Sequence, residues 1–298
     1  MSQTLRDKVT VPGVRARKAT APDGRAERLV VLTAYDHPTA RALDRAGVDI
    51  LLVGDSLGMV VLGHASTLPV RLEMMLHHTA AVARAGTRAL VIADMPWLTY
   101  HTGPADAVRQ AGRLVQEGGA EGVKLEGGRN RLKVVRALVD AEIPVMGHLG
   151  LTPQSVHVMG GYRVQGKKLS QAEALVQDAR LLEEAGAFAL VLEGIPAAVA
   201  GLVTRSIDIP TIGIGAGPDC DGQVLVVHDL VGLGETTPPR FVRRYAEVSR
   251  ILTQSAEAFA RDVRSGSFPS ERESYPTPPD LQARLGEASA VPECRGRE

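Results

Sequence analysis

The sequence has 298 residues, 44% hydrophobic and 23% charged, which is an ordinary globular composition and suits one large α/β domain of about 250 residues. Its 34 basic residues balance its 34 acidic residues, so no net charge attracts nucleic acid or an anionic membrane surface. Aromatic residues make up only 3%, which disfavours a surface that stacks nucleic-acid bases.

The cysteine content and the lengths of the apolar runs indicate in which cellular compartment the protein lies. The two cysteines, Cys220 and Cys294, lack the spacing of a metal motif, and this indicates a reducing environment without a disulfide framework. No apolar run is long enough to cross a membrane, and the first residues lack the apolar stretch of a secretory signal. We therefore expect a cytoplasmic protein.

One unit repeats along the chain: an apolar run, a polar or glycine-rich turn, and an amphipathic segment. Near-continuous apolar runs are typical of strands that are buried on both faces. Strands that alternate with helices predict a parallel sheet, and eight repeats predict its closure into a (β/α)8 TIM barrel. The expected strands are residues 29–35, 50–55, 89–94, 122–126, 144–148, 188–193, 211–215 and 224–228.

Amphipathic segments between these runs predict the helices of the barrel. Several end in glycine, as at Gly47, Gly86, Gly119 and Gly186, because glycine takes the left-handed conformation of a helix C-terminus at little cost. The expected helices are residues 38–46, 71–85, 105–118, 131–141, 171–185 and 197–206.

The repeat is irregular in its second half. The gap between the seventh and eighth runs is too short for a full helix, so a turn or a single helical turn is expected there. Residues 150–168 are rich in Gly, Gln and Ser and predict a loop over the barrel mouth, since long loops in compact domains are often functional lids. A final helix is expected at residues 240–264.

Three parts follow from this pattern. Residues 1–27 are expected to form an N-terminal extension, with room for a short helix before the first strand. Residues 28–268 are expected to form the catalytic barrel. Residues 269–298 are rich in Pro, Ser, Glu and Arg, a composition that predicts a disordered tail.

Acidic residues end three successive expected strands: Asp55, Asp94 and Glu126. Active sites of such barrels lie at the C-terminal strand ends, and adjacent strands are about 4.8 Å apart, so these acids would lie within roughly 10 Å of one another. Clustered carboxylates repel unless a cation neutralises them. Oxygen ligands favour magnesium or manganese over zinc. The alternative is that each acid only caps the helix that follows it.

Three further residues at strand ends are candidates for chemistry. Lys124 shares a face with Glu126 and could bind a substrate carboxylate or enolate oxygen, form a Schiff base, or only neutralise Glu126. Glu193 follows an apolar strand and could be a general base or a helix-capping acid. His148 could donate a hydrogen bond to the substrate or be a core histidine with all its hydrogen bonds satisfied.

A glycine-rich turn at residues 213–217 follows the seventh expected strand. Many barrels bind phosphate there through backbone N–H groups. The alternative is that the glycines only permit a tight connection.

Six motifs occur in one order: LTAYD at 32–36, VGDSLG at 53–58, ADMP at 93–96, VKLEGG at 123–128, GHLGLTPQS at 147–155 and GIGAG at 213–217. Together they resemble the 3-methyl-2-oxobutanoate hydroxymethyltransferase (ketopantoate hydroxymethyltransferase) family, from about residue 30 to residue 268. The resemblance implies a (β/α)8 barrel that transfers a hydroxymethyl group from 5,10-methylenetetrahydrofolate to 3-methyl-2-oxobutanoate. The product would be 2-dehydropantoate, on the route to pantothenate and coenzyme A.

The resemblance also implies roles for single residues. Asp55 and Asp94 would ligate a divalent metal, usually Mg²⁺, and Glu126 would join that site directly or through water. Asp55, Ser56, Asp94, Lys124 and His148 are then the expected substrate-binding residues, and Glu193 is the expected proton acceptor. Members of the family look like homo-oligomers, commonly decamers.

Two other interpretations remain open. A folate-independent lyase or mutase of the phosphoenolpyruvate mutase/isocitrate lyase kind would also hold a 2-oxo acid on magnesium, and a requirement for tetrahydrofolate distinguishes the two enzymes. A non-catalytic barrel that only binds a ligand is disfavoured by the polar strand ends, and metal-dependent turnover would exclude it.

Overall fold

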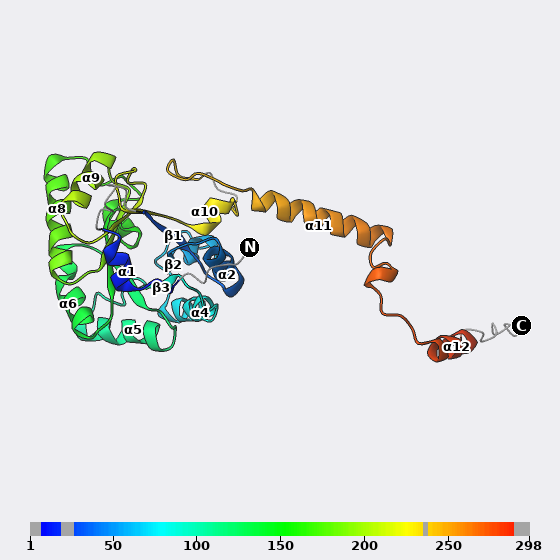
Figure 1. Cartoon of the computed structure of the whole chain (residues 1–298). Coiled ribbons are helices and arrows are strands. Elements are labelled where there is room, and N and C mark those ends of the chain that lie inside the picture. Colours follow the sequence, from blue (N-terminus) through cyan, green and yellow to red (C-terminus); the bar gives the residue numbers. More distant parts are fainter. Residues whose placement is uncertain (1–6, 19–26, 235–237, 289–298) are drawn as a thin grey trace, which may run out of the picture. The chain divides into compact units, whose positions relative to one another are not determined.

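The structure is a computed structural model that describes residues 7–18, 27–234 and 238–288 (Figure 1). The chain divides into two compact units, with the boundary between residues 246 and 247. None of the described helices is long and apolar enough to span a membrane.

The first unit is a closed barrel of eight parallel strands in chain order, with β8 paired to β1 (Figure 1). The expected (β/α)8 barrel is thus confirmed. The strands are β1 (Leu29–Thr33), β2 (Ile50–Val53), β3 (Leu90–Asp94), β4 (Gly122–Glu126), β5 (Val145–Gly150), β6 (Ala189–Glu193), β7 (Thr211–Ile214) and β8 (Gly222–Leu225).

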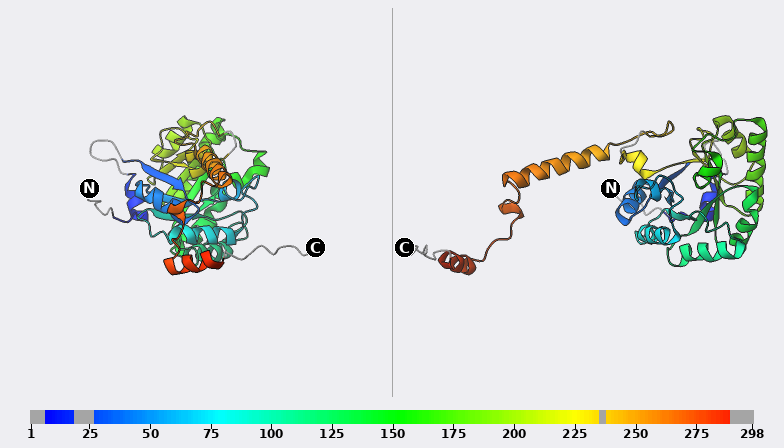
Figure 2. Two further views of the ribbon diagram at one scale, coloured as in Figure 1. Left: turned by 90° about the vertical axis from the view of Figure 1, so that its right-hand side faces the viewer. Right: turned by 180° about the vertical axis from the view of Figure 1, so that it is seen from behind.

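Helices surround the strands (Figure 2), and each of the six expected helices forms within two residues of its expected bounds. Their ends follow from local chemistry. Asp36 caps α2 by accepting a hydrogen bond from the Thr39 amide at 2.8 Å, and Gly47, just beyond the helix, has a φ of +90°. The helices of this unit are α1 (Val11–Ala16), α2 (His37–Arg45), α3 (Leu57–Val60), α4 (Leu72–Ala83), α5 (Pro104–Gln116), α6 (Leu132–Asp140), α7 (Val156–Met159), α8 (Leu169–Glu184), α9 (Ala197–Arg205) and α10 (Val227–Val231), with short 3-10 helices at Arg129–Arg131 and Pro153–Ser155.

The eighth strand lies earlier than the apolar run at 224–228 predicts. Gly222 pairs with Leu29, and a Cβ at Gly222 would lie only 2.6 Å from the Leu29 carbonyl oxygen, so this close pairing requires glycine. The run then turns into α10, where the Val227 amide donates to Thr33 Oγ1 at 2.9 Å. The link from β7 to β8 contains no helix, as its length predicts.

Two apolar layers fill the unit. One lies between the strands and the surrounding helices. The other fills the barrel interior and includes Val14 of α1, which is fully buried against side chains such as Leu29, Ile50 and Leu90. These residues begin their strands, so α1 closes the N-terminal end of the barrel. It is the short helix for which the N-terminal extension has room.

The long loop after β5 is only partly irregular. It contains the 3-10 helix at Pro153–Ser155 and the single turn of α7, and its far end is held where the Gln165 amide donates to the Gly194 carbonyl at 2.9 Å. The loop therefore begins and ends beside the C-terminal strand ends.

The second unit contains α11 (Val248–Ser265), a 3-10 helix at Glu271–Glu273 and α12 (Pro279–Ala288). The final helix thus begins later than residue 240, and the division between the units falls before residue 268. Within the expected tail, Ser270 and Glu273 form a capping box at the 3-10 helix, and Pro279 begins α12 at the position where proline is favoured. Residues 1–6, 19–26 and 289–298 lie outside the described chain.

Two glycines of the β5 loop provide a test of this architecture. Gly150 has a φ of +96°, and a Cβ there would lie 2.2 Å from the Glu193 carbonyl oxygen. Gly160 has a φ of +66° with open space around it. Gly160→Ala is expected to cost about 1–2 kcal/mol for the left-handed conformation. Gly150→Ala is expected to cost that amount and about 1–3 kcal/mol more, because the new Cβ clashes with the Glu193 carbonyl oxygen. Urea denaturation measures both, and equal losses would contradict the close contact between β5 and β6.

Candidate active site

Six polar side chains end successive strands at one end of the barrel. Cross-strand pairing sets Asp94 beside Lys124 and Glu126 beside His148. Five of the six residues are buried, and the side chain of Glu193 is 17% exposed. The strand ends therefore gather the predicted site residues: Asp55, Asp94, Lys124, Glu126, His148 and Glu193.

Asp55 and Asp94 meet through the turn after β2. The Asp55 amide donates to Asp94 Oδ2 at 3.0 Å, and Lys124 Nζ lies 3.0 Å from Asp94 Oδ1. A Cβ on Gly54 would lie 2.7 Å from Ser56 Oγ, so a side chain there would displace the Ser56 hydroxyl. Ser56 Oγ lies 2.9 Å from the hydroxyl of Tyr35, which places the predicted substrate contact beside the carboxylates.

Gln154 is a buried residue of this site that the strand pattern does not reveal. Its Nε2 donates to Asp55 Oδ2 at 2.8 Å and to the Met95 carbonyl at 3.0 Å, and its backbone amide donates to Glu126 Oε2 at 3.0 Å. Tyr100 donates its hydroxyl proton to Gln154 Oε1 at 2.5 Å, which fixes the orientation of the amide. Gln154 thus holds two of the three predicted metal-site acids.

His148 connects Lys124 to Glu193. Lys124 Nζ lies 3.2 Å from His148 Nδ1, and His148 Nε2 lies 3.3 Å from Glu193 Oε2. Glu126 Oε1 is 3.7 Å from His148 Nδ1, too far for a hydrogen bond. Burial and the charge of Lys124 lower the pKa of His148, which disfavours the protonated ring.

Burial and mutual charge shift the pKa values of the carboxylates and the lysine in this site. Burial and the charge of Asp94 raise the pKa of Asp55 to about 7. Burial and the charge of Asp55 raise the pKa of Glu126 well above its ordinary value. Burial lowers the pKa of Lys124, but the charges of Asp94, Glu126 and Asp55 outweigh that effect and raise it overall. Lys124 is therefore an ammonium, which supports charge pairing rather than a Schiff base.

The donor set fits a hard divalent cation. Three buried acids beside one buried lysine leave an excess of two negative charges when the acids are ionised, and Asp94 Oδ1 accepts no well-aligned hydrogen bond. Across the described chain, no three His, Cys, Asp or Glu side chains are arranged around one metal position. Asp55 and Asp94 are joined through the Asp55 amide, and Gln154 donates to one oxygen each of Asp55 and Glu126. Mg²⁺ commonly takes one or two carboxylates and keeps several waters.

The glycine-rich turn at 213–217 has packing partners that explain its glycines. Gly217 has a φ of +78°, and a Cβ there would lie 2.3 Å from the Ala197 Cβ. Gly215 has a φ of +60°, and a Cβ there would lie 2.8 Å from the Phe241 ring. These contacts support the tight connection rather than a phosphate site.

Comparison with known proteins identifies the family to which the chain belongs. The profile of the family described as "Ketopantoate hydroxymethyltransferase" matches residues 8–271. The chain belongs to the ketopantoate hydroxymethyltransferase family. A 3-methyl-2-oxobutanoate hydroxymethyltransferase of Trichlorobacter lovleyi is 53% identical over 91% of this chain and 100% of its own length. The enzyme of that name from Koribacter versatilis is 56% identical over 86% of this chain and 87% of its own. The resemblance inferred from the six motifs is confirmed.

Solved structures of low identity share the barrel fold of this ketopantoate hydroxymethyltransferase family member. A 2,3-dimethylmalate lyase, described as a PEP mutase/isocitrate lyase superfamily member, is 18% identical with a TM-score of 0.56 and 94% coverage of both chains. The phosphoenolpyruvate phosphomutase of Streptomyces platensis subsp. rosaceus is 15% identical with a TM-score of 0.57, over 94% of this chain and 97% of its own. These likenesses show the fold alone, and the lyase or mutase alternative is not favoured.

Gln154→Ala tests whether the Gln154 side chain orients the acids of the predicted metal site. Loss of the amide that holds Asp55 Oδ2 is expected to weaken Mg²⁺ binding about 10-fold to 100-fold, as for other residues that orient metal ligands. Titration calorimetry measures the affinity. Gln177→Ala, at an exposed position of α8, is the matched control. Unchanged affinity in Gln154→Ala would remove Gln154 from this role.

Proposed function

We propose that this chain catalyses hydroxymethyl transfer from 5,10-methylenetetrahydrofolate to 3-methyl-2-oxobutanoate, giving 2-dehydropantoate for pantothenate and coenzyme A biosynthesis. The observation that carries the proposal is the buried set of Asp55, Asp94 and Lys124 with Glu193 within reach of the same strand ends. Family membership and the printed names of its relatives support the same reaction.

Asp55 and Asp94 would hold Mg²⁺, with Glu126 acting through water. When bound, the ion would polarise the 2-oxo group and so acidify the proton on C3. Ser56 Oγ and the Lys124 ammonium lie beside these acids and would bind the 2-oxo acid. Lys124 would add positive charge where negative charge develops on the substrate oxygen.

Glu193 would accept the proton of C3. The electron pair of the broken C3–H bond would then form the new carbon–carbon bond to the methylene carbon of the folate. Both bonds between that carbon and the folate nitrogens N5 and N10 break, and water supplies the hydroxyl group. The proton taken from C3 and one proton of that water end on the two nitrogens. Tetrahydrofolate is the second product, and the step needs no oxidant or reductant.

Proton NMR of 3-methyl-2-oxobutanoate in deuterated water, with enzyme and Mg²⁺, tests this function directly. Loss of the C3 proton signal is expected before folate is added, because Glu193 exchanges its proton with solvent. 2-Dehydropantoate is expected only after methylenetetrahydrofolate is added. Exchange without folate-dependent product would favour a folate-independent lyase, and neither outcome with folded, metal-loaded protein would reject the substrate.

Two substitutions separate the base from the metal ligands. Glu193→Gln is expected to slow C3 exchange by about 10²–10⁴-fold, because it removes the proton acceptor, while Mg²⁺ affinity stays near that of the unsubstituted protein. Asp55→Asn is expected to weaken Mg²⁺ binding and exchange together. Titration calorimetry measures the Mg²⁺ affinity, and proton NMR measures the rate of C3 exchange. Full exchange in Glu193→Gln would show that another group is the base.

We propose that the protein is a cytoplasmic homo-oligomer, with a decamer as the expected assembly. None of the residues of α11 is buried by the unit to which the helix belongs. Its apolar side chains Ile251, Leu252, Phe259 and Val263 are exposed, and a second copy of this chain would cover them. The zero net charge of each copy does not oppose association. The buried free thiol of Cys220 suits a reducing compartment.

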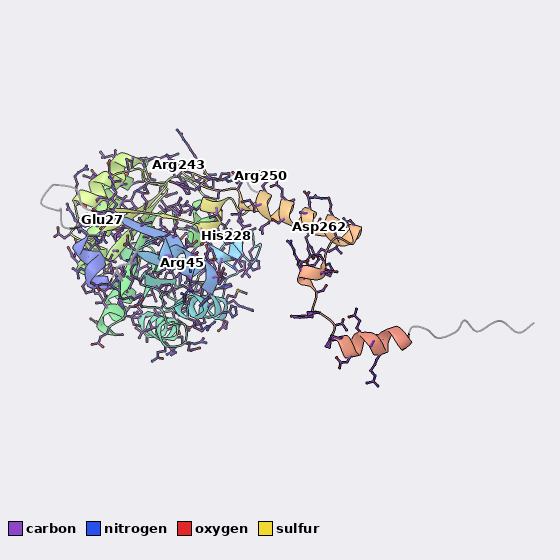
Figure 3. All side chains as sticks on the ribbon, turned by 45° about the vertical axis from the view of Figure 1, so that its right-hand side comes forward. Glu27, Arg45, His228, Arg243, Arg250 and Asp262 are labelled. Carbon is purple, nitrogen blue, oxygen red and sulfur yellow. The ribbon has the colours of Figure 1, made fainter. Side chains whose placement is uncertain are left out.

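Leu252→Glu tests the assembly. Its side chain is 55% exposed on α11, and a charge at this position is expected to lower the mass measured by light scattering after size exclusion, because it disfavours burial of the apolar face. Arg250→Glu, on the same helix (Figure 3), is the control and should leave the mass unchanged. A mass of 31.6 kDa for the unsubstituted protein would contradict the oligomer.

A further inference from the structure

A row of four side chains connects the predicted metal site to the predicted base. Asp94, Lys124, His148 and Glu193 come from the successive strands β3, β4, β5 and β6. The distances along the row are 3.0 Å from Asp94 Oδ1 to Lys124 Nζ, 3.2 Å to His148 Nδ1, and 3.3 Å from His148 Nε2 to Glu193 Oε2. Only the last member reaches solvent to any extent.

Lys124 determines which nitrogen of His148 carries the proton. An ammonium group can only donate hydrogen bonds, and the contact with Asp94 holds Lys124 in that form. His148 Nδ1 must therefore accept from Lys124. In the neutral ring the proton is then on Nε2, the nitrogen that faces Glu193.

The Nε2–H group has one carboxylate within reach. Nε2 is fully buried and makes no well-aligned hydrogen bond among the described residues, although Glu193 Oε2 is 3.3 Å away. A buried N–H group is costly to leave unpaired. Catalytic hydrogen bonds are often long or poorly aligned before substrate binds and tighten in the complex.

Glu193 needs such a partner. Its backbone carbonyl accepts from the Leu151 amide at 2.8 Å. Among the described Lys, Arg and His side chains, that of His148 is the one within 4.0 Å of its carboxylate. With Oε2 facing His148, Oε1 is the oxygen that can point to the substrate.

We infer that His148 is a positioning residue that orients the Glu193 carboxylate through its Nε2–H group, with its tautomer set by Lys124. This role deepens the proposed function and rests on it, because orienting Glu193 matters only when Glu193 is the base. It differs from both alternatives that the sequence left open for His148, which are a hydrogen bond to the substrate and a core histidine with all its hydrogen bonds satisfied.

Two substitutions at His148 separate its two nitrogens. His148→Asn retains an acceptor near Nδ1 for Lys124 and removes the donor to Glu193. His148→Gln can place an amide N–H near Nε2 and removes the acceptor. We expect His148→Asn to lower the maximal rate of C3 deuterium exchange about 10-fold to 100-fold, by analogy with other orienting residues. KM for 3-methyl-2-oxobutanoate and Mg²⁺ affinity should change little, and His148→Gln should recover most of the rate.

The opposite pattern would overturn the inference. A higher KM with an unchanged maximal exchange rate in His148→Asn would mean that His148 binds the substrate directly. Equal losses of rate in the two variants would mean that the exchange rate does not depend on the hydrogen-bond donor to Glu193. No exchange by the unsubstituted, metal-loaded protein would instead reject the proposed function, and this outcome is distinct from both.

A spectroscopic measurement tests the tautomer without any turnover. ¹⁵N NMR of the unsubstituted protein with labelled histidine distinguishes a protonated from an unprotonated ring nitrogen, and the signal missing from either variant identifies His148 among the eight histidines. We expect a neutral ring with its proton on Nε2. A ring protonated on Nδ1 would exclude the contact with Lys124 and reject the inference whatever the exchange rates of the variants.

Discussion

The chemistry at the mouth of this barrel depends on the burial of three carboxylates beside a single lysine. Asp55, Asp94 and Glu126 are almost removed from solvent, where each negative charge opposes the others and burial opposes all of them. Lys124 offsets one of these charges. A divalent cation would offset the other two, and this excess of charge is the strongest physical reason to expect a metal here.

Neighbouring residues determine which oxygen atoms are available. Gln154 engages one oxygen of Asp55 and one of Glu126, and the Asp55 amide engages one oxygen of Asp94. Tyr100 holds the Gln154 amide in the orientation that these contacts need. The acids are therefore oriented before any ligand arrives, and preorganisation of this kind lowers the cost of binding a metal and a charged substrate.

The sequence predicts the strand ends well because, in a parallel barrel, the C-terminal ends of all strands meet at one end. The local pattern that marks a strand therefore also places its last side chain in the fold. An apolar run that ends in Asp94 or Glu126 fixes both the strand and the place of its last side chain. Gln154 lies in the 3-10 helix Pro153–Ser155 and Tyr100 lies in the loop after β3, and they meet across 54 positions of the chain, so no local periodicity reveals their contact. The eighth strand was misplaced for a related reason: its start is set by close pairing of Gly222 with β1, not by the apolar run that follows.

Helix α1 has a consequence for the movement of ligands. Val14 of α1 fills the N-terminal end of the barrel interior, and the strands around it are packed with side chains rather than surrounding a channel. Among the described residues, the packed interior therefore gives no route to Asp55 or Glu193 from that end, and ligands reach them from the side of the C-terminal strand ends. Of two ligands stacked on that side, the deeper one would arrive first and leave last.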